Sequence, residues 1–181
     1  MSATPAPILI GYFPKRRTQR PGWLEADAVR EICSVSECMA AGPEGWIHAW
    51  KHNAWGVFDT PALAWGVVPE REREAFDLFA YAVYPARFVS GFKAALDVQI
   101  EGVAPRDPSF LMLGYDIVSR GPNAFECSPL SCNGWAGEVG TNEWCLVDDL
   151  DEALRLASIA EASGCEPGDY LVVQVWRGSA P

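Results

Sequence analysis

Apolar residues in this chain fall into short runs that proline and glycine interrupt, which indicates short strands and loops rather than long helices. Residues 8–13 form the first run and Pro14 ends it, so we expect a buried strand there. Residues 76–84, 110–118 and 170–176 carry apolar side chains on both faces, which is typical of central strands.

Weaker signals predict further strands between these. Asn133-Gly134 is the strongest hairpin-turn signal, because a type I′ turn needs positive φ at both central residues. We expect this turn to join a strand within 125–132 to another within 135–139. Residues 95–100 and 144–147 are two more candidate strands.

Two segments have clear helical patterns. Residues 24–32 can form a short amphipathic helix. A longer helix is expected from 149 to about 162, because Asp149 and Glu152 match a capping box and Gly164 is a typical helix end.

A third helix is predicted over residues 46–52. Trp46 and Trp50 lie four residues apart and so share one face, as do His48 and His52. The two pairs are offset by about 200° around the helix. If the Trp pair packs inward, the His pair faces solvent.

Strands and helices in this mixed order predict an α+β fold, with a mainly antiparallel mixed sheet of about six to seven strands and about three helices. The length of 181 residues fits one domain, residues 1–181, with a flexible lead-in at 1–7. We find no linker and no long repeat in the sequence.

The charge balance narrows the choice of partners. The net charge of −10 comes from 24 acidic and 14 basic side chains. Such an excess repels nucleic acid and anionic membranes, so we expect neither as a partner, whereas it suits a basic protein. The 8 Trp exceed what a core of this size requires, so we expect binding residues among them: Trp46, Trp50, Trp55 and Trp65.

The cellular compartment is predicted from two further observations. The first residues lack the charged and apolar regions of a signal peptide, and apolar runs stay below the about 20 residues that cross a bilayer. Six Cys without a secretion signal favour reduced thiols. We therefore expect a cytoplasmic protein.

Two Cys followed by two His suggest a zinc site made of Cys33, Cys38, His48 and His52. The central gap of this pattern is shorter than usual, and cysteines five apart converge only in a loop. The simpler interpretation is that His48 and His52 are solvent-facing polar residues. We therefore expect no metal and no cofactor.

A second pair, Cys127 and Cys132, repeats the Cys-Ser-x-x-x-Cys pattern of Cys33 and Cys38. If both pairs joined with Cys145, they would form a thiolate-rich site or a redox switch. Alternatively, each cysteine is a small buried hydrophobic residue, which is the more usual role of a reduced thiol.

Residues 15–20 are a basic run in an acidic chain. Arg16 and Arg17 suit a phosphate or carboxylate of a small anionic ligand, although they can equally pair with surplus acids. Arg17 followed by Ser34, Ser36 and a late Glu126 loosely resembles the order of features in ADP-ribosyltransferase-like folds, without their paired Glu-x-Glu. This resemblance implies a catalytic set of four residues: Arg17, Ser34, Ser36 and Glu126.

Asp116 lies inside the clearest strand and needs a partner there, for which Arg87 and Arg120 are candidates. No nucleophile elbow and no glycine-rich phosphate loop is found. We therefore expect a protein-binding module, such as an inhibitor or immunity-type protein that caps a basic partner. The alternative is a small enzyme acting on a nucleotide or another anionic ligand.

Overall fold

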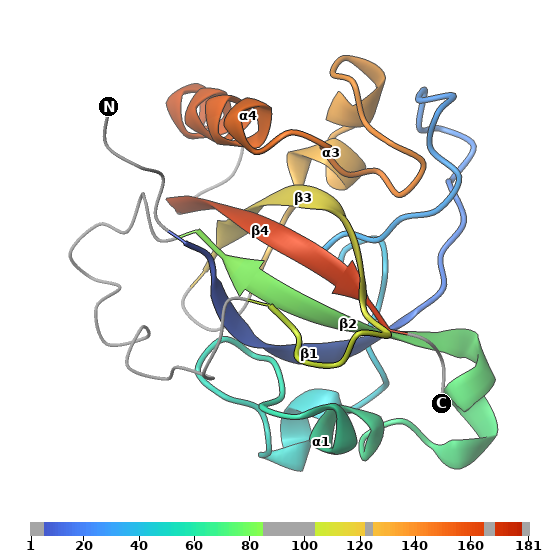
Figure 1. Cartoon of the computed structure of the whole chain (residues 1–181). Coiled ribbons are helices and arrows are strands. Elements are labelled where there is room, and N and C mark those ends of the chain that lie inside the picture. The colour runs from blue at the N-terminus through green and yellow to red at the C-terminus, as the bar shows by residue number, and fades with distance from the viewer. Residues whose placement is uncertain (1–5, 85–103, 122–124, 165–168, 179–181) are drawn as a thin grey trace.

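The computed structural model describes residues 6–84, 104–121, 125–164 and 169–178, and at its centre lies an antiparallel four-stranded sheet (Figure 1). The strand order is β1-β2-β4-β3, so the first and third strands form the two edges. The strands are β1 (Ile8–Arg16), β2 (Phe76–Val83), β3 (Leu111–Arg120) and β4 (Asp169–Arg177). All four strands were expected, but Pro14 does not end β1, which continues through it to Arg16 as an edge strand.

The sheet is smaller than predicted, because the described residues hold four strands in place of six to seven. The candidate strand at 95–100 lies outside the described residues. Residues 144–147 form only an isolated bridge, from Val147 to Tyr115. The general α+β class stands, but the strand count was wrong.

The hairpin expected at Asn133-Gly134 does not form. Gly134 has positive φ, but Asn133 has φ −107°, which a type I′ turn does not allow. The flanking residues are helical instead: α3 (Pro129–Cys132) precedes the turn and the 3₁₀ helix η5 (Trp135–Gly137) follows it. Pro129 at the first helical position explains α3, since proline is pre-set for that position and cannot donate to a sheet.

The long helix α4 (Leu150–Ser163) confirms the capping prediction. The Asp149 side chain accepts from the Glu152 amide at 2.9 Å, and Gly164 ends the helix in the left-handed conformation. Its buried residues pack on β3 and β4. No helix within the described ranges is both long enough and apolar enough to cross a membrane.

The helix expected over residues 46–52 is reduced to a single 3₁₀ turn, η1 (Trp46–Ala49). Trp50 adopts φ 53°, a left-handed conformation that ends the turn. As a result the two Trp side chains separate: Trp46 is half-buried, whereas Trp50 is 86% exposed. Trp46 and Trp50 therefore do not share one face, as the expected helix required.

Two seven-residue segments share a short sequence pattern and the same contacts. Residues 53–59 and 142–148 both read Asn-x-Trp-x-x-x-Asp. In both segments the Asn side chain donates to a strand carbonyl and to the closing Asp. These bonds are Asn53 to Ile10 O (2.9 Å) and Asp59 (2.9 Å), and Asn142 to Leu113 O (2.8 Å) and Asp148 (2.7 Å).

The edge strands carry matching glycines beside these turns. Gly11 in β1 and Gly114 in β3 have φ of 143° and 148°, and each lies at a register shift. A Cβ would lie 2.6 Å from Phe58 O at the first position and 2.9 Å from Val147 O at the second. Glycine is therefore required at both sites by the close approach of the repeated turn.

A capped helix follows each turn: α1 (Pro61–Trp65) after the first, capped by Thr60, and α4 after the second. The register between β2 and β4 is also symmetric about one central residue pair. Tyr81 faces Val175 at the centre, and the flanking pairs are Phe79 with Arg177 and Val83 with Val173. The two halves of the chain are thus related by a local twofold axis through the middle of the sheet.

A buried polar contact fixes the segment 33–38 across one face of this sheet. Lys15, on edge strand β1, is 1% exposed, and its ammonium donates to three consecutive backbone carbonyls. The acceptors are Ser34 O (2.7 Å), Val35 O (2.7 Å) and Ser36 O (2.5 Å). Burial lowers the pKa of Lys15 to about 8, so the group is still mainly charged at neutral pH and offers one proton to each carbonyl.

The opposite edge strand holds the same segment through Asp116, which is fully buried in β3. Its carboxylate accepts from Ser34 Oγ at 2.8 Å and from the Val35 amide at 2.7 Å. Ser128 Oγ donates to its other oxygen at 2.6 Å. Burial raises the pKa of Asp116, while these hydrogen bonds oppose that shift. Asp116 is therefore satisfied by hydroxyls and amides. Of its two candidate arginine partners, Arg120 donates to Ala54 O, and Arg87 lies outside the described residues.

Replacing Lys15 with Met tests this contact. The variant leaves three buried carbonyls without their donor, so we expect the free energy of unfolding to fall by about 3 kcal/mol or more. Arg16→Met is the matched control, because Arg16 forms a surface ion pair with Glu72 and its loss costs about 1 kcal/mol or less. Urea unfolding measures both; equal losses would contradict the role of Lys15.

Cys145 provides a test of burial through pH. Burial raises the pKa of this thiol to about 12, whereas in the unfolded chain it ionises near pH 9. As pH rises above 9, the unfolded state loses the proton first, so this thiol's contribution to stability is lost progressively between pH 9 and 12.

We therefore expect Cys145→Ala to be less sensitive to alkaline pH than the parent protein. The parent's advantage in unfolding free energy should shrink by about 1.4 kcal/mol per pH unit above 9. Cys145 has φ 63°, and Ala has a Cβ as Cys does. The backbone strain at this position is therefore the same in both proteins and cancels when their unfolding free energies are compared. Urea unfolding with reductant at pH 8 and pH 10 measures both free energies, and a constant difference would refute a buried neutral thiol.

Candidate functional site

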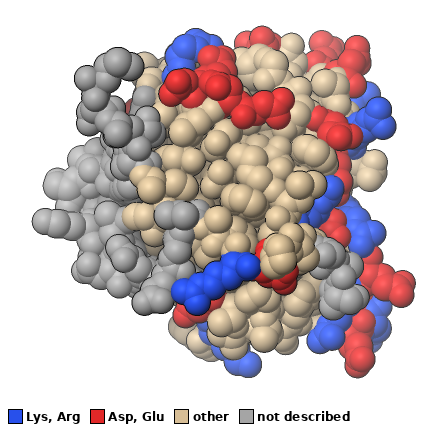
Figure 2. Space-filling view, in the orientation of Figure 1, with Lys and Arg blue, Asp and Glu red and all other residues tan. Residues whose placement is uncertain are grey.

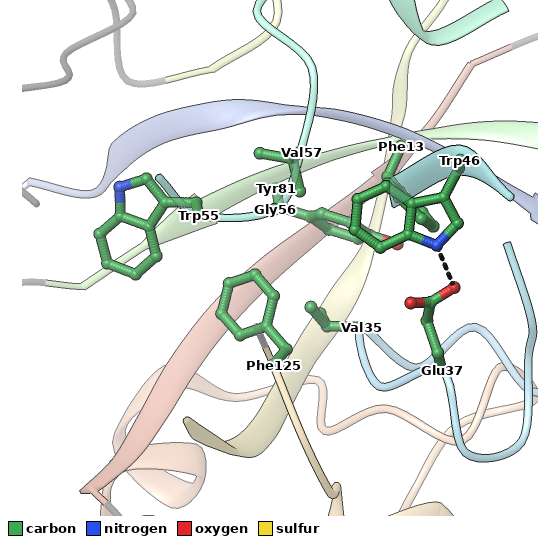
Figure 3. Close-up of a pocket in the computed structure, with 9 residues that line it drawn as sticks. All are labelled: Phe13, Val35, Glu37, Trp46, Trp55, Gly56, Val57, Tyr81 and Phe125. Carbon is green, nitrogen blue, oxygen red and sulfur yellow. Dashed lines mark hydrogen bonds between the residues drawn. The ribbon is translucent and has the colours of Figure 1, made fainter. Parts of the chain in front are cut away.

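A narrow aromatic pocket lies beside the segment that Lys15 holds (Figure 3). Its lining residues come from β1, β2, the segment 33–38, the loop 46–57 and the residue that follows β3 across the chain gap. They are Phe13, Val35, Glu37, Trp46, Trp55, Gly56, Val57, Tyr81 and Phe125. Five of these nine are aromatic, and Glu37 is the one acid among them.

Glu37 is positioned by two hydrogen bonds to one of its oxygens. Oε1 accepts from Trp46 Nε1 at 3.1 Å and from the Gly42 amide at 2.9 Å. Figure 3 shows the first bond fixing the Trp46 ring at one side of the pocket. The Trp46 ring also packs edge-on against Phe13, with centroids 4.8 Å apart. The carboxylate is thus held beside an aromatic wall.

The far side of the pocket is held in a similar way. Trp55 is 1% exposed and stacks with Phe125 at a centroid distance of 6.0 Å. The Arg120 guanidinium lies over the Trp55 ring at 4.3 Å, a cation–π contact that fixes the indole from outside. Both sides of the pocket are therefore held in place by contacts within the protein.

Tyr81 is the unusual residue of the pocket. It is fully buried, and among the described residues its hydroxyl has no hydrogen-bond partner. Burial, reinforced by nearby acids, raises the pKa of this hydroxyl well above its ordinary value, so it keeps its proton. A buried polar group without a partner is uncommon and needs an explanation, such as a ligand or an ordered water.

The size of the pocket limits what it can bind. Its cavity volume is about 20 Å³, which is the room for about one water molecule. A larger group therefore enters only if the surrounding side chains move, and a nucleotide does not fit. Trp46 also borders a wider, more open hollow, lined by Trp46, Ile47, His48, Trp50, His52, Asn53 and Ala54.

The four Trp predicted to bind a partner have different environments. Trp46 and Trp55 line the narrow pocket, and Trp46 and Trp50 line the hollow. Trp65, in α1, is half-buried and packs against the core. The stretch from 46 to 55 therefore brings three of the four predicted residues to one region.

The predicted anionic or catalytic site forms only in part: the Ser36 amide donates to Ser34 Oγ at 3.1 Å, but the arginines are paired with other groups. Arg16 pairs with Glu72 and Arg17 with Asp77, each at 3.0 Å. Ser34 is buried against Asp116, as described above. Ser36 is also buried and donates to the backbone carbonyl of Glu126, whose side chain is exposed.

The predicted zinc residues also separate. Cys33 is buried in the core, while His48 and His52 lie on the open loop that borders the hollow. Cys38 instead lies with Cys127 and Cys132, and their sulfur atoms are within 4.8 Å of one another. The repeated Cys-Ser-x-x-x-Cys pattern was the sequence signal that could have paired Cys38 with Cys132.

Comparison with known proteins finds no relative, since no protein-family model, no curated protein and no solved structure matches the chain. Function must therefore be argued from the contacts of the residues themselves.

Tyr81→Phe tests whether the pocket hydroxyl is unpaired. Removing a buried hydroxyl without a partner relieves its desolvation cost, so we expect stability equal to or above that of the parent protein. Urea unfolding in ligand-free buffer measures the change. A loss of about 1 kcal/mol or more would mean that the hydroxyl has a partner in the free protein.

Proposed function

We propose that this protein is a binding module for a basic protein partner, and that an alkylated ammonium group of the partner enters the narrow aromatic pocket. The observation that carries the proposal is the combination of five aromatic rings, the Glu37 carboxylate and the unpartnered Tyr81 hydroxyl in one small pocket. By covering its partner's basic surface, such a module would act as inhibitor and immunity proteins do.

The chemistry of the pocket favours a cation over other ligands. The faces of aromatic rings attract positive charge, and such cages are the usual means of recognising quaternary or methylated ammonium groups. An unmodified ammonium is strongly hydrated and loses more on entering an apolar site. Glu37, which lines the pocket, adds the counter-charge.

The surroundings of the pocket suit a larger partner. Ile47 is 49% exposed and Trp50 is 86% exposed, and both line the hollow next to Trp46. Exposed aromatic and aliphatic groups around a buried residue are typical of protein interfaces. A partner lying in the hollow would therefore cover them while one of its side chains enters the pocket.

Charge supports the same partner only in a general way. On the face seen in Figure 2, a wide uncharged area lies between margins where acidic and basic side chains alternate. The acidic side chains on this face form no single patch, and the net charge of −10 gives a general attraction for a basic protein. The nucleotide-enzyme alternative has weaker support, because Arg16 and Arg17 are already paired with carboxylates.

A peptide pair tests the proposal. One peptide has a central trimethyllysine, and the other has its neutral isostere with carbon in place of the nitrogen. Two lysines flank the central residue in both peptides, so that the long-range electrostatic attraction to the acidic protein is similar. We expect the cation to bind at least about 10-fold more tightly, the size of a desolvated cation–π contact. Titration followed by Trp fluorescence measures both affinities, and equal binding would refute the aromatic cage.

Three variants locate the site. Trp46→Leu and Glu37→Gln should each remove most of the preference for the cation over the isostere. Trp65→Phe is the matched control, since Trp65 packs on the core outside the pocket lining, and it should keep the preference. A preference unchanged in Trp46→Leu would place binding elsewhere.

A further inference from the structure

Three cysteines from two distant segments of the chain meet. Cys38 ends the segment 33–38 that Lys15 and Asp116 hold, while Cys127 precedes the short helix α3 and Cys132 is its last residue. Their three sulfur atoms lie within 4.8 Å of one another. No disulfide joins any of the five described cysteines.

The backbone holds the three sulfurs in place. Ser34 and Ser128, each the residue after the first Cys of a Cys-Ser-x-x-x-Cys segment, donate to the two different oxygens of Asp116. Both segments are thus fixed to the same carboxylate, and the last Cys of each, Cys38 and Cys132, comes into the cluster. The Cys132 amide donates to Ser128 O at 2.8 Å, and this closed turn returns Cys132 toward Cys127.

From this geometry we propose that Cys38, Cys127 and Cys132 form a binding site for a thiophilic metal ion of the Zn²⁺ type. Three thiols would lose their protons to solvent and bind the ion as thiolates, which are the ligands that zinc and related soft cations prefer. Tetrahedral Zn²⁺ with bonds of about 2.3 Å needs sulfur atoms about 3.8 Å apart. Contraction by about 1 Å or less from the observed limit of 4.8 Å is within reach of side-chain rotation.

One neighbouring hydroxyl suits such an ion. Ser131 Oγ lies 3.8 Å from Cys132 Sγ and can donate to a thiolate there, and outer partners of this kind orient metal ligands. Without an ion, the thiols of Cys38 and Cys127 donate to Glu126 O at 3.4 Å and to Asn133 Oδ1 at 3.9 Å, and both bonds would be given up on metal binding. Cys38 is exposed, so the ion has a path from solvent and a water molecule can complete the coordination.

Cobalt titration of the full chain tests the site. The protein is purified with a phosphine reductant and without chelator, and Co²⁺ is added as a spectroscopic substitute for Zn²⁺. We expect one equivalent to bind with thiolate-to-cobalt charge-transfer absorbance and tetrahedral visible bands, and one equivalent of Zn²⁺ to remove both. Absence of the charge-transfer band, or formation of a disulfide between the cluster cysteines in its place, would overturn the proposal.

Variants assign the ligands. Cys38→Ser replaces an exposed side chain, so this variant should fold, and Cys132→Ser changes a second ligand. Each variant should weaken Zn²⁺ binding at least about 10-fold, because even the loss of an outer partner of a metal ligand has an effect of this size. His48→Ala/His52→Ala is the control, because both histidines lie outside the cluster, and it should bind as the parent does. Unchanged affinity in Cys38→Ser, or lost affinity in the histidine variant, would refute this ligand set.

Discussion

The buried ammonium of Lys15 is the contact on which the rest of the structure depends. It comes from one edge strand and donates to three successive carbonyls of a segment that has no regular secondary structure of its own. Buried carbonyls outside helices and sheets must find donors or the segment cannot lie on the core. Lys15 supplies those donors. Asp116, on the other edge strand, accepts from the Ser34 hydroxyl and the Val35 amide of the same segment.

This pair of contacts explains why both candidate sites are in one region. Val35 and Glu37, which line the aromatic pocket, and Cys38, in the sulfur cluster, belong to the segment that Lys15 and Asp116 fix. Across from it, Phe125 and Cys127 are likewise close neighbours in the chain. A metal ion held by the cluster would therefore join the two segments that supply Glu37 and Phe125 to the pocket lining.

Local patterns predicted the parts of the fold that depend on local physics. The four strands were found because runs such as 76–84 are apolar on both faces, and α4 because its cap is made by residues three apart in the sequence. The failures arose where a nearby residue or a local backbone conformation overrides such a signal. Asn133-Gly134 fits a hairpin by propensity, yet Pro129 starts a helix before it. Likewise, spacing placed Trp46 and Trp50 on one helix face, but the chain turns left-handed at Trp50.

The site was harder to predict than the fold because its residues come from distant segments. The prediction of binding residues drew attention to Trp46 and Trp55, but nothing local indicates that Tyr81, in a central strand, would lie beneath them. The cysteine cluster is different, since its signal was present in the repeated Cys-Ser-x-x-x-Cys segments. That signal acquires meaning only with Asp116, because one carboxylate has two oxygens and can hold the two serines of two such segments at once. Asp116 is therefore best understood as the residue that converts a sequence repeat into a three-dimensional site.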